Sequence, residues 1–147
     1  MITKPDPQQL LETIDFSIPI QVRFSDIDGY LHVNNGIYFS YFEHARASFL
    51  NDLFDWNIME IGTVVGRVAI DYYKPIHLGD EVRGLVNCSR LGKASFDIEQ
   101  YLIGTTSDGT LVTFAHCSCV MVSVDRHSMK PTPIPAEFRE KLSAKSA

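Results

Sequence analysis

The sequence of 147 residues lacks the marks of several large protein classes. It has no run of about twenty consecutive apolar residues, so no membrane-spanning helix is predicted, and residues 1–15 contain no apolar stretch of the secretory type. Only 13 lysines and arginines stand against 18 aspartates and glutamates, and a net charge of −5 does not favour nonspecific binding to nucleic acid. We therefore expect a cytoplasmic protein without a membrane or nucleic-acid partner.

Cysteine is also scarce, with three residues, Cys88, Cys117 and Cys119. The number is odd, and the last two have the i, i+2 spacing of neighbours on one face of a strand. This pattern predicts buried free thiols and argues against a disulfide framework or a zinc site.

What the sequence does contain is typical of one globular domain that spans residues 1–147. Hydrophobic residues make up 45% and charged residues 21%, both near globular averages. Near the start, Asp6 and Pro7 open a short helical stretch, which predicts a capped helix at about residues 6–13. Proline- and serine-bearing residues from about 131 to 147 predict a C-terminal tail.

Hydrophobic periodicity predicts the main elements. Apolar residues alternate with polar or small ones over residues 16–24, as in a half-buried strand. Residues 37–54 contain no proline or glycine and carry a wide apolar stripe at helical spacing, which predicts a long core helix. Four strand-like runs follow, at 64–73, 81–91, 94–105 and 110–124.

Short turns between these four runs predict antiparallel pairing. The order of elements predicts an α+β fold in which an antiparallel sheet wraps around one long helix. The alternation also leaves one face of the sheet for water or for a partner. Because unpaired edge strands invite association, we expect a homodimer formed edge to edge.

The most polar segment, residues 25–35, lies between the first strand and the long helix. The first helical turn, near Asn35 and Gly36, has backbone N–H groups without helical acceptors, and such groups favour negative charge. A carboxylate in this loop could attack a substrate or activate water, while the N–H groups stabilise the oxyanion of an acyl-transfer reaction.

Structural roles for the same residues stay open. Asn34 or Asn35 could simply cap the helix. One of Asp26 and Asp28 could brace the loop through turn hydrogen bonds. A metal site made of Asp26, Asp28 and His32 is not favoured, because no further ligands at metal-site spacing follow in the sequence.

Several segments resemble the hotdog-fold acyl-CoA thioesterases related to 4-hydroxybenzoyl-CoA thioesterase. The segments are Arg23-Phe24-Ser25-Asp26-Ile27-Asp28, His32-Val33-Asn34-Asn35, Tyr38, Tyr41-Phe42-Glu43, Ala45-Arg46, Asp71-Tyr72, Lys74-Pro75, Leu78-Gly79-Asp80-Glu81 and Asp108-Gly109. The likeness covers about residues 18–142. It implies the hotdog fold, with a five-stranded antiparallel sheet around one long central helix, assembled as a dimer or as a tetramer that is a dimer of dimers.

The resemblance also implies roles in the loop. Asp28 matches the catalytic carboxylate, which acts as nucleophile or general base. The backbone N–H of Asn35 matches the helix-end donor to the thioester oxygen, and Asp26 becomes the bracing residue. His32, which is similar in context to the His-Val-Asn-Asn of plant acyl-carrier-protein thioesterases, has three open roles: proton transfer, substrate orientation, or packing in the core.

Further residues are implied to bind substrate. Arg90 and Lys93, with Ser95 adjacent, match the region where the family contacts coenzyme A, although a solvated basic turn is the alternative reading. Tyr38, together with Phe39 and Phe42, could line the acyl pocket or belong to the core.

Two charged residues of the long helix complete the set of candidates. Glu43 and Arg46, three positions apart on the helix, could pair with each other or with a dimer mate, or they could touch the substrate. Glu43 is also the substitute carboxylate if Asp28 has no catalytic role.

The leading hypothesis is therefore an acyl-CoA thioester hydrolase, which releases a free carboxylic acid and coenzyme A. Its substrate is a thioester of coenzyme A or of acyl carrier protein. No metal or redox cofactor is expected, since coenzyme A enters only as part of the substrate. Two alternatives stay open: a hotdog enoyl-thioester hydratase or dehydratase, and a noncatalytic acyl-thioester binding module.

Overall fold

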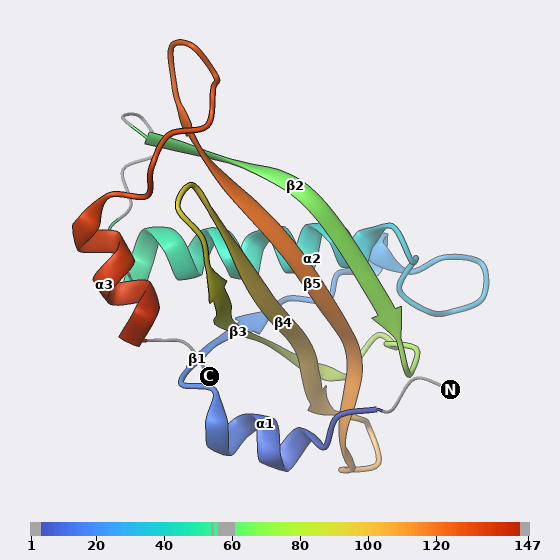
Figure 1. Ribbon diagram of the computed structural model, residues 1–147. Coiled ribbons are helices and arrows are strands. Elements are labelled where there is room, and N and C mark those ends of the chain that lie inside the picture. The colour runs from blue at the N-terminus through green and yellow to red at the C-terminus, as the bar shows by residue number, and fades with distance from the viewer. Residues whose placement is uncertain (1–3, 54, 56–60, 145–147) are drawn as a thin grey trace.

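The computed structural model describes residues 4–53, 55 and 61–144, and its centre is one five-stranded antiparallel sheet (Figure 1). The strands are β1 (Phe16–Ile20), β2 (Ile61–Tyr72), β3 (Glu81–Leu91), β4 (Ser95–Thr105) and β5 (Leu111–Asp125). They lie in the order β1-β3-β4-β5-β2, so β1 and β2 are the edges. The predicted α+β fold with a five-stranded antiparallel sheet is confirmed.

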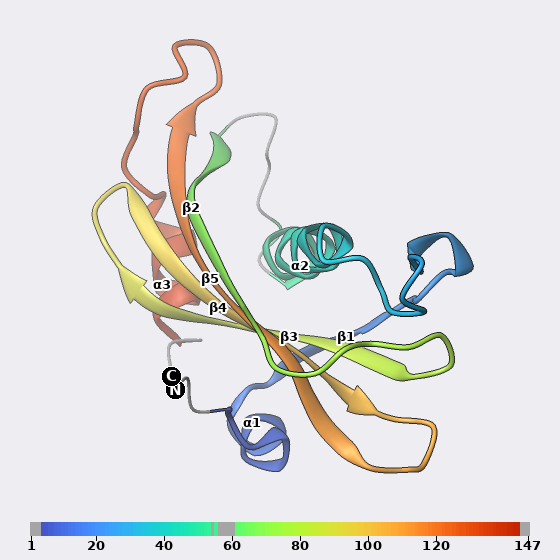
Figure 2. The same ribbon diagram turned by 90° about the vertical axis from the view of Figure 1, so that its right-hand side faces the viewer.

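The long helix α2 (Ile37–Ser48) lies against the concave face of this sheet (Figure 2). Its apolar stripe is buried there, with Phe42 and Ala45 at most 1% exposed. Helix and sheet approach closely at Gly84 of β3, where an added Cβ would lie 3.0 Å from the Cβ of Ala45. The predicted helix 37–54 is therefore correct in place, but its last residues 49–53 form a π-helical turn, η2 (Phe49–Leu53), and residue 54 lies outside the described residues.

The first strand is shorter than predicted. Alternation in the sequence continues to Phe24, but β1 ends at Ile20, and residues 24–26 form a 3₁₀ turn, η1 (Phe24–Asp26). The turn is held by the side chain of Asp26, whose Oδ2 accepts a hydrogen bond of 3.0 Å from the backbone N–H of Arg23. Phe24 is consequently 82% exposed instead of continuing the buried face.

Helices at the two ends of the chain pack on the sheet. Helix α1 (Pro7–Thr13) begins after Asp6, whose Oδ1 accepts a hydrogen bond from the N–H of Gln8. Its Leu10 packs with Leu85 and other residues on the face away from α2, so α1 covers part of the face that the alternation leaves open. Helix α3 (Ala136–Ala144) packs against β3 and lies within the predicted C-terminal tail.

The structure bears on two further predictions, one about the cysteines and one about membrane-spanning helices. The three cysteines are buried and none forms a disulfide, which confirms the prediction of buried thiols. Burial raises the pKa of the Cys117 thiol to about 12, so this sulfur stays protonated at neutral pH. In the described part of the chain, no helix is both long enough and apolar enough to cross a membrane.

The outer face of the sheet carries a polar cluster around His116 of β5. Its Nε2 lies 2.6 Å from Oε2 of Glu99 on β4, and its Nδ1 lies 3.7 Å from Oδ2 of Asp71 on β2. The ring of Tyr101 stacks on the imidazole at 4.8 Å between centroids. The hydrogen bond to Glu99 is the main cause that raises the pKa of His116 above 6.5, while burial opposes it.

This raised pKa predicts a stability contribution that depends on pH. Since His116 binds its proton more tightly in the folded protein, the contribution is complete below about pH 6.5 and is lost as pH rises through the higher folded pKa. We expect the difference in free energy of unfolding between wild type and Glu99→Gln to shrink from about pH 5.5 to about pH 9. Urea denaturation across this range measures it, and a difference independent of pH would contradict the assignment.

Candidate functional site

The loop between η1 and α2 forms a tight turn that is held by backbone hydrogen bonds. The backbone N–H of Asp28 donates to the carbonyl of His32 at 2.9 Å, and the N–H of Leu31 donates to the carbonyl of Asp28 at 3.0 Å. Leu31 itself has a φ of 66°, which is uncommon outside glycine. The N–H of Val33 donates to the carbonyl of Ile76 at 2.8 Å and so ties the loop to the segment after β2. Asp28 and His32 therefore face each other across one tight turn.

Asp26 braces this loop, as the sequence predicted for one of the two aspartates. It is 9% exposed, and its Oδ2 accepts a 2.6 Å hydrogen bond from the hydroxyl of Tyr41 as well as the one from Arg23. Its carbonyl accepts from the N–H of Asn34 at 2.9 Å. Burial, and then the hydrogen bond to Asp26, raises the pKa of Tyr41 above its ordinary value, so the phenol stays a donor.

A cavity of about 220 Å³ opens where the loop meets the start of α2 and the end of β2. Three of the predicted site residues, His32, Asn35 and Tyr38, line it together. The other wall comes from Val33 and from the segment Tyr72, Tyr73, Lys74 and Pro75, which sequence reasoning did not assign to the site. The structure thus brings the loop, the start of α2 and the end of β2 together around one cavity.

Asn34 and Asn35 divide two tasks at the start of the helix. Oδ1 of Asn34 accepts a 2.9 Å hydrogen bond from the N–H of Gly36 in a turn that precedes the helix. The N-cap of α2 is Gly36, and no side chain makes a cap hydrogen bond there, so the prediction that Asn34 or Asn35 caps the helix is wrong. Among the described residues, no acceptor is bonded to the backbone N–H of Asn35. The carbonyl of Asn35 accepts from the hydroxyl of Tyr72 at 2.9 Å. An N–H donor at a helix start therefore borders the cavity and is available to a ligand.

Tyr38 is a core residue that also forms a wall of the cavity, so its prediction as a core residue is confirmed, while its role in an acyl pocket stays a prediction. Its side chain is 2% exposed, and its ring stacks on that of Tyr72 at 4.9 Å between centroids. Burial raises the pKa of Tyr38 to about 12, so the phenol is neutral at ordinary pH. The residues expected beside it do not line this cavity: Phe42 is buried in the core and Phe39 is 51% exposed.

His32 is half-buried and lines the cavity, so the reading of a core histidine is wrong. Its ring packs edge to face against His77, with 4.8 Å between centroids and an angle of 89°. The backbone N–H of His77 donates to Oδ2 of buried Asp80 at 2.9 Å. Sequence reasoning missed His77 as a neighbour of the site, since only the fold brings residue 77 to residue 32.

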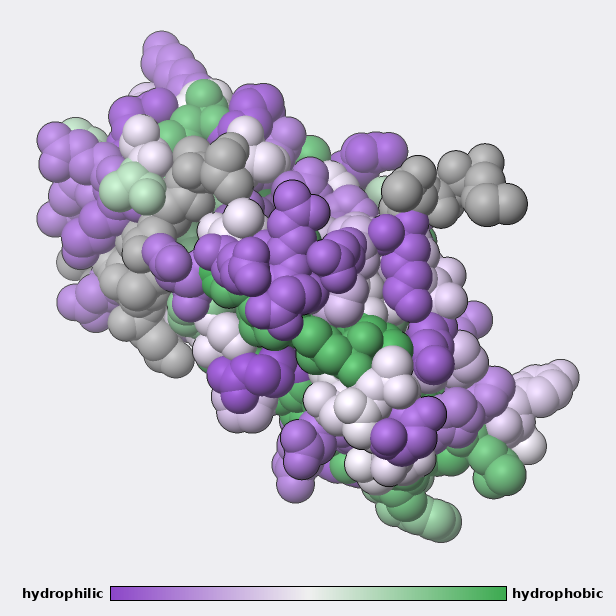
Figure 3. All heavy atoms as spheres, turned by 90° about the horizontal axis from the view of Figure 1, so that it is seen from below, coloured by the Kyte–Doolittle hydropathy of each residue, from purple (hydrophilic) through white to green (hydrophobic). Residues whose placement is uncertain are grey.

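Asp28 stands beside the cavity but does not line it. The side chain is half-buried, and its Oδ1 accepts a 2.9 Å hydrogen bond from the N–H of Tyr30. Oδ2 has no hydrogen-bond partner among the described residues. Tyr30 and Leu31 at the tip of the same loop are 83% and 73% exposed. The face of the molecule drawn in Figure 3 carries hydrophobic patches among hydrophilic residues. Exposed apolar side chains of this kind are typical of a surface that a partner covers.

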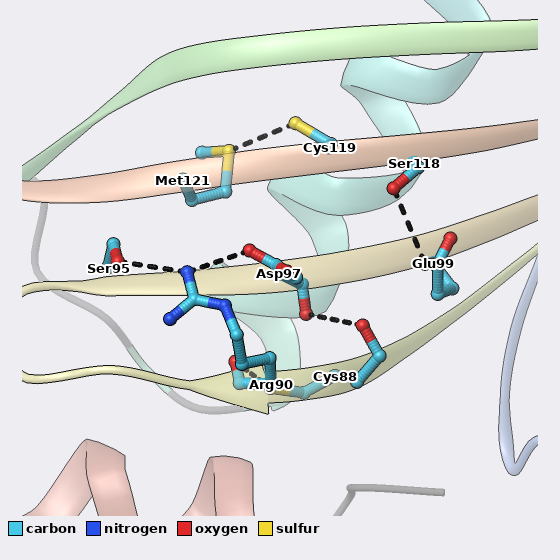
Figure 4. Close-up of polar contacts among 9 residues, drawn as sticks. Cys88, Arg90, Ser95, Asp97, Glu99, Ser118, Cys119 and Met121 are labelled. Atoms are coloured by element: carbon cyan, nitrogen blue, oxygen red, sulfur yellow. Dashed lines mark hydrogen bonds and ion pairs between the residues drawn. The ribbon is translucent and has the colours of Figure 1, made fainter.

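Arg90, Lys93 and Ser95 lie at the β3–β4 hairpin, far from the loop in both views (Figures 1 and 2). Nη2 of Arg90 donates to Oγ of Ser95 at 3.0 Å and to Oδ1 of Asp97 at 2.9 Å, as Figure 4 shows. Lys93 is exposed at the turn. Within one chain, the structure does not bring these residues to the cavity.

Comparisons with known proteins agree with this geometry. A family model described as "Thioesterase-like superfamily" matches residues 22–142. The long-chain acyl-CoA thioesterase FadM of Escherichia coli is 32% identical over 126 residues, which cover 84% of this chain and 93% of FadM. A thioesterase of Thermus thermophilus, crystallised with coenzyme A and zinc, superposes with a TM-score of 0.77 at 33% identity, over 91% of this chain and 96% of that one. The PA5185 protein of Pseudomonas aeruginosa gives a TM-score of 0.82 at 30% identity, over 92% and 94% of the two chains.

Proposed function

The chain belongs to the thioesterase-like superfamily, and on that premise we propose that it hydrolyses acyl-CoA thioesters to a free carboxylic acid and coenzyme A. The expectation of an enzyme of the thioesterase class is confirmed at the level of the family. The observation that carries the proposal is the cavity in which the open N–H of Asn35, at the start of α2, meets His32. Such a donor is suited to the oxygen of a thioester carbonyl, which becomes an oxyanion during acyl transfer.

The proposed reaction uses groups of this loop. The N–H of Asn35 donates to the thioester oxygen and stabilises its developing charge, an effect of about 10²- to 10³-fold in rate for a single donor. The Asp28 carboxylate either attacks the acyl carbon, which gives a mixed anhydride and the thiolate of coenzyme A, or takes a proton from an attacking water. Water then completes the hydrolysis in the first case. Two observations support this role of Asp28: its Oδ2 has no partner in the described part of the chain, and the residue lies across the turn from His32.

His32 and the aromatic wall have complementary tasks in this proposal. His32 delivers a proton to the departing thiolate or orients the substrate, and its place in the cavity supports either task. Tyr38 and Tyr72, stacked on each other, contact the acyl group. Coenzyme A takes part only as the thiol half of the substrate.

Contact with the nucleotide end of coenzyme A is proposed to come from a second subunit. In the sheet, Ser95 is in register with Val122, which pairs with Val64 of β2, whereas the cavity lies at Tyr72. Eight residues of strand separate Val64 from Tyr72, or about 26 Å. Antiparallel pairing of β2 with β2 of another copy would place the Val64 end of one chain beside the Tyr72 end of the other.

This pairing supports the proposal of a homodimer with active sites at subunit interfaces, while the dimer of dimers stays a prediction. The outer edge of β2 pairs with no other strand in the described part of the chain. Val64 and Val65 on that edge are 36% and 43% exposed. Arg90, Lys93 and Ser95 of one subunit would then serve the cavity of its partner, where the positive charges of Arg90 and Lys93 suit the phosphates of coenzyme A.

A panel of acyl-CoA substrates with a thiol reagent tests the proposed function. We expect catalytic release of free thiol from at least one class of acyl-CoA, with an equal amount of free carboxylic acid detected by mass spectrometry. Tight binding of acyl-CoA without release of thiol would favour the binding module instead. Addition of water to an enoyl-CoA with the thioester intact would favour the hydratase.

A further inference from the structure

His77 lies next to the candidate site without lining its cavity. Its side chain is 49% exposed, and its ring packs edge to face against that of His32, which does line the cavity. The backbone sets up this contact, because the N–H of Val33 donates to the carbonyl of Ile76 and so brings residues 32 and 77 together on either side of that bond. The two rings therefore meet through the fold of both segments.

The turn that carries His77 is held by hydrogen bonds at both ends. The N–H of Asp80 donates to the carbonyl of His77 at 3.1 Å, and the N–H of His77 donates to Oδ2 of Asp80 at 2.9 Å. Gly79 between them has a φ of 99°, which glycine adopts without strain. Asp80 is only 9% exposed, so its carboxylate is fixed in the interior. Because Nδ1 of His77 lies 3.8 Å from the same Oδ2, the carboxylate restrains the ring as well as the backbone.

The ring of His32 depends on His77 for its orientation. In the part of the chain that the structure describes, the ring nitrogens of His32 form no hydrogen bond, and its ring contact is with His77. A half-buried side chain in a loop has several staggered rotamers available to it. Perpendicular packing favours one of them, since aromatic rings prefer edge-to-face contact. His77 therefore limits the directions in which the imidazole of His32 can point.

The orientation of His32 matters for both of the tasks proposed for it. A group that delivers a proton must come within hydrogen-bond reach of the atom that receives it. A misplacement of about 1 Å can lower the rate of an enzymatic step by about a hundredfold. An imidazole that points away from the cavity can neither protonate a departing thiolate nor orient a substrate. A neighbour that fixes this ring thus contributes to the reaction without contact with the substrate.

We propose that His77 is a positioning residue, which holds the imidazole of His32 in the cavity while the buried carboxylate of Asp80 holds His77. The inference rests on the proposed function and deepens it, since it names the residues that prepare one of the reacting groups. His77 acts only through His32. Its removal should therefore lower the rate of the chemical step more than the affinity for acyl-CoA.

Steady-state release of thiol from an acyl-CoA substrate tests this role. We expect His77→Ala to lower kcat about tenfold and to leave KM within about twofold, because the ring of His32 loses its preferred orientation while the cavity keeps its walls. His77→Phe keeps an aromatic ring at the contact and should retain at least about half of the wild-type kcat. His127→Ala, which removes an exposed histidine after β5, is the matched control and should behave like wild type.

A double-mutant cycle separates positioning from a general loosening of the structure. His32→Gln removes the ring that His77 is proposed to hold. In that background, we expect His77→Ala to have no further effect on kcat, because no imidazole is left to be positioned. A role of His77 in stability alone would lower kcat by the same factor in both backgrounds. Circular dichroism establishes that each variant is folded.

Nuclear magnetic resonance tests the contact without substrate. The Cε1–Hε1 signal of His32, assigned by its absence from the spectrum of His32→Gln, reports the magnetic environment of that ring. We expect this signal to move in His77→Ala, since the neighbouring ring is lost, and to stay in place in His127→Ala. A wild type that hydrolyses no acyl-CoA would refute the proposed function in the kinetic assay, whereas the spectra test the contact between the rings independently of it.

Three results would overturn the proposal. They are a folded His77→Ala variant with the wild-type kcat, an equal loss of kcat on His77→Ala substitution with and without His32, and a His32 signal that His77→Ala leaves unchanged. Failure of His77→Phe to retain activity, with a tenfold loss in His77→Ala, would likewise contradict positioning by ring contact.

Discussion

Replacement of Asp28 by asparagine is expected to lower kcat/KM for acyl-CoA hydrolysis by about 10²- to 10⁴-fold, the range for loss of a catalytic acid, base or nucleophile. The amide can neither attack a thioester nor take a proton from water. It keeps an oxygen that accepts the 2.9 Å hydrogen bond from the N–H of Tyr30, so the turn of the loop should stay folded. Steady-state release of thiol, measured with the substrate that wild type prefers, gives the ratio.

Asp108→Asn is the matched control for this variant. Asp108 also accepts a hydrogen bond at Oδ1 from a backbone N–H two residues later, that of Thr110 at 3.1 Å, but it lies in the exposed turn between β4 and β5. The control removes the same charge from the same kind of turn, so its kcat/KM should match that of wild type. Activity of Asp28→Asn equal to that of wild type would contradict the assignment and make Glu43 the next carboxylate to test.

The Asp28 experiment is informative because, within a single chain, the Asp28 carboxylate lies next to the cavity without lining it. Asp28 is hydrogen-bonded to the backbone of His32, which lines the cavity, but its own side chain does not line it. If the subunit interface completes the site, activity should depend on Asp28 and also fall when dimers dissociate. Comparison of Asp28→Asn with diluted wild type separates these causes, since only the diluted wild type should recover activity at high protein concentration.

Local patterns in the sequence predicted most of the fold. The run 81–91 became β3 with the same boundaries, because alternation and flanking turns are both local signals. The predictions failed where one side chain sets the backbone. Asp26 bends the chain after β1, because its carboxylate accepts a hydrogen bond from the backbone N–H of Arg23. The pattern of apolar residues does not predict that hydrogen bond.

Only those residues of the candidate site that lie close together in the sequence were predictable. Polar residues followed by a helix start indicated His32, Asn35 and Asp28, whereas Tyr72 and His77 reach the same place through pairing between distant segments. The bond from the N–H of Val33 to the carbonyl of Ile76, which fixes this meeting, joins residues far apart in the chain.

Gly104 is the clearest case of a residue whose importance the sequence conceals. It lies near the end of β4, paired with Val82 of β3, and nothing in the pattern of apolar residues distinguishes it. A Cβ at this position would overlap the carbonyl oxygen of Glu81 and lie 2.8 Å from the carbonyl carbon. Both are backbone atoms of the neighbouring strand, so they cannot move aside as a flexible side chain could.

Gly104→Ala is therefore expected to lower the free energy of unfolding by about 4 kcal/mol or more, which is a large part of the roughly 5–15 kcal/mol that a domain of ordinary stability possesses. The strands β3 and β4 would have to separate at this end, with loss of ladder hydrogen bonds and of the packing of Val82, which is 4% exposed. Urea denaturation followed by circular dichroism measures the change. Gly29→Ala is the control, because no atom outside its chain neighbours lies within 4 Å of the added carbon, and it should unfold close to wild type. A Gly104→Ala protein with wild-type stability would mean that the two strands are spaced more widely here than the structure has them.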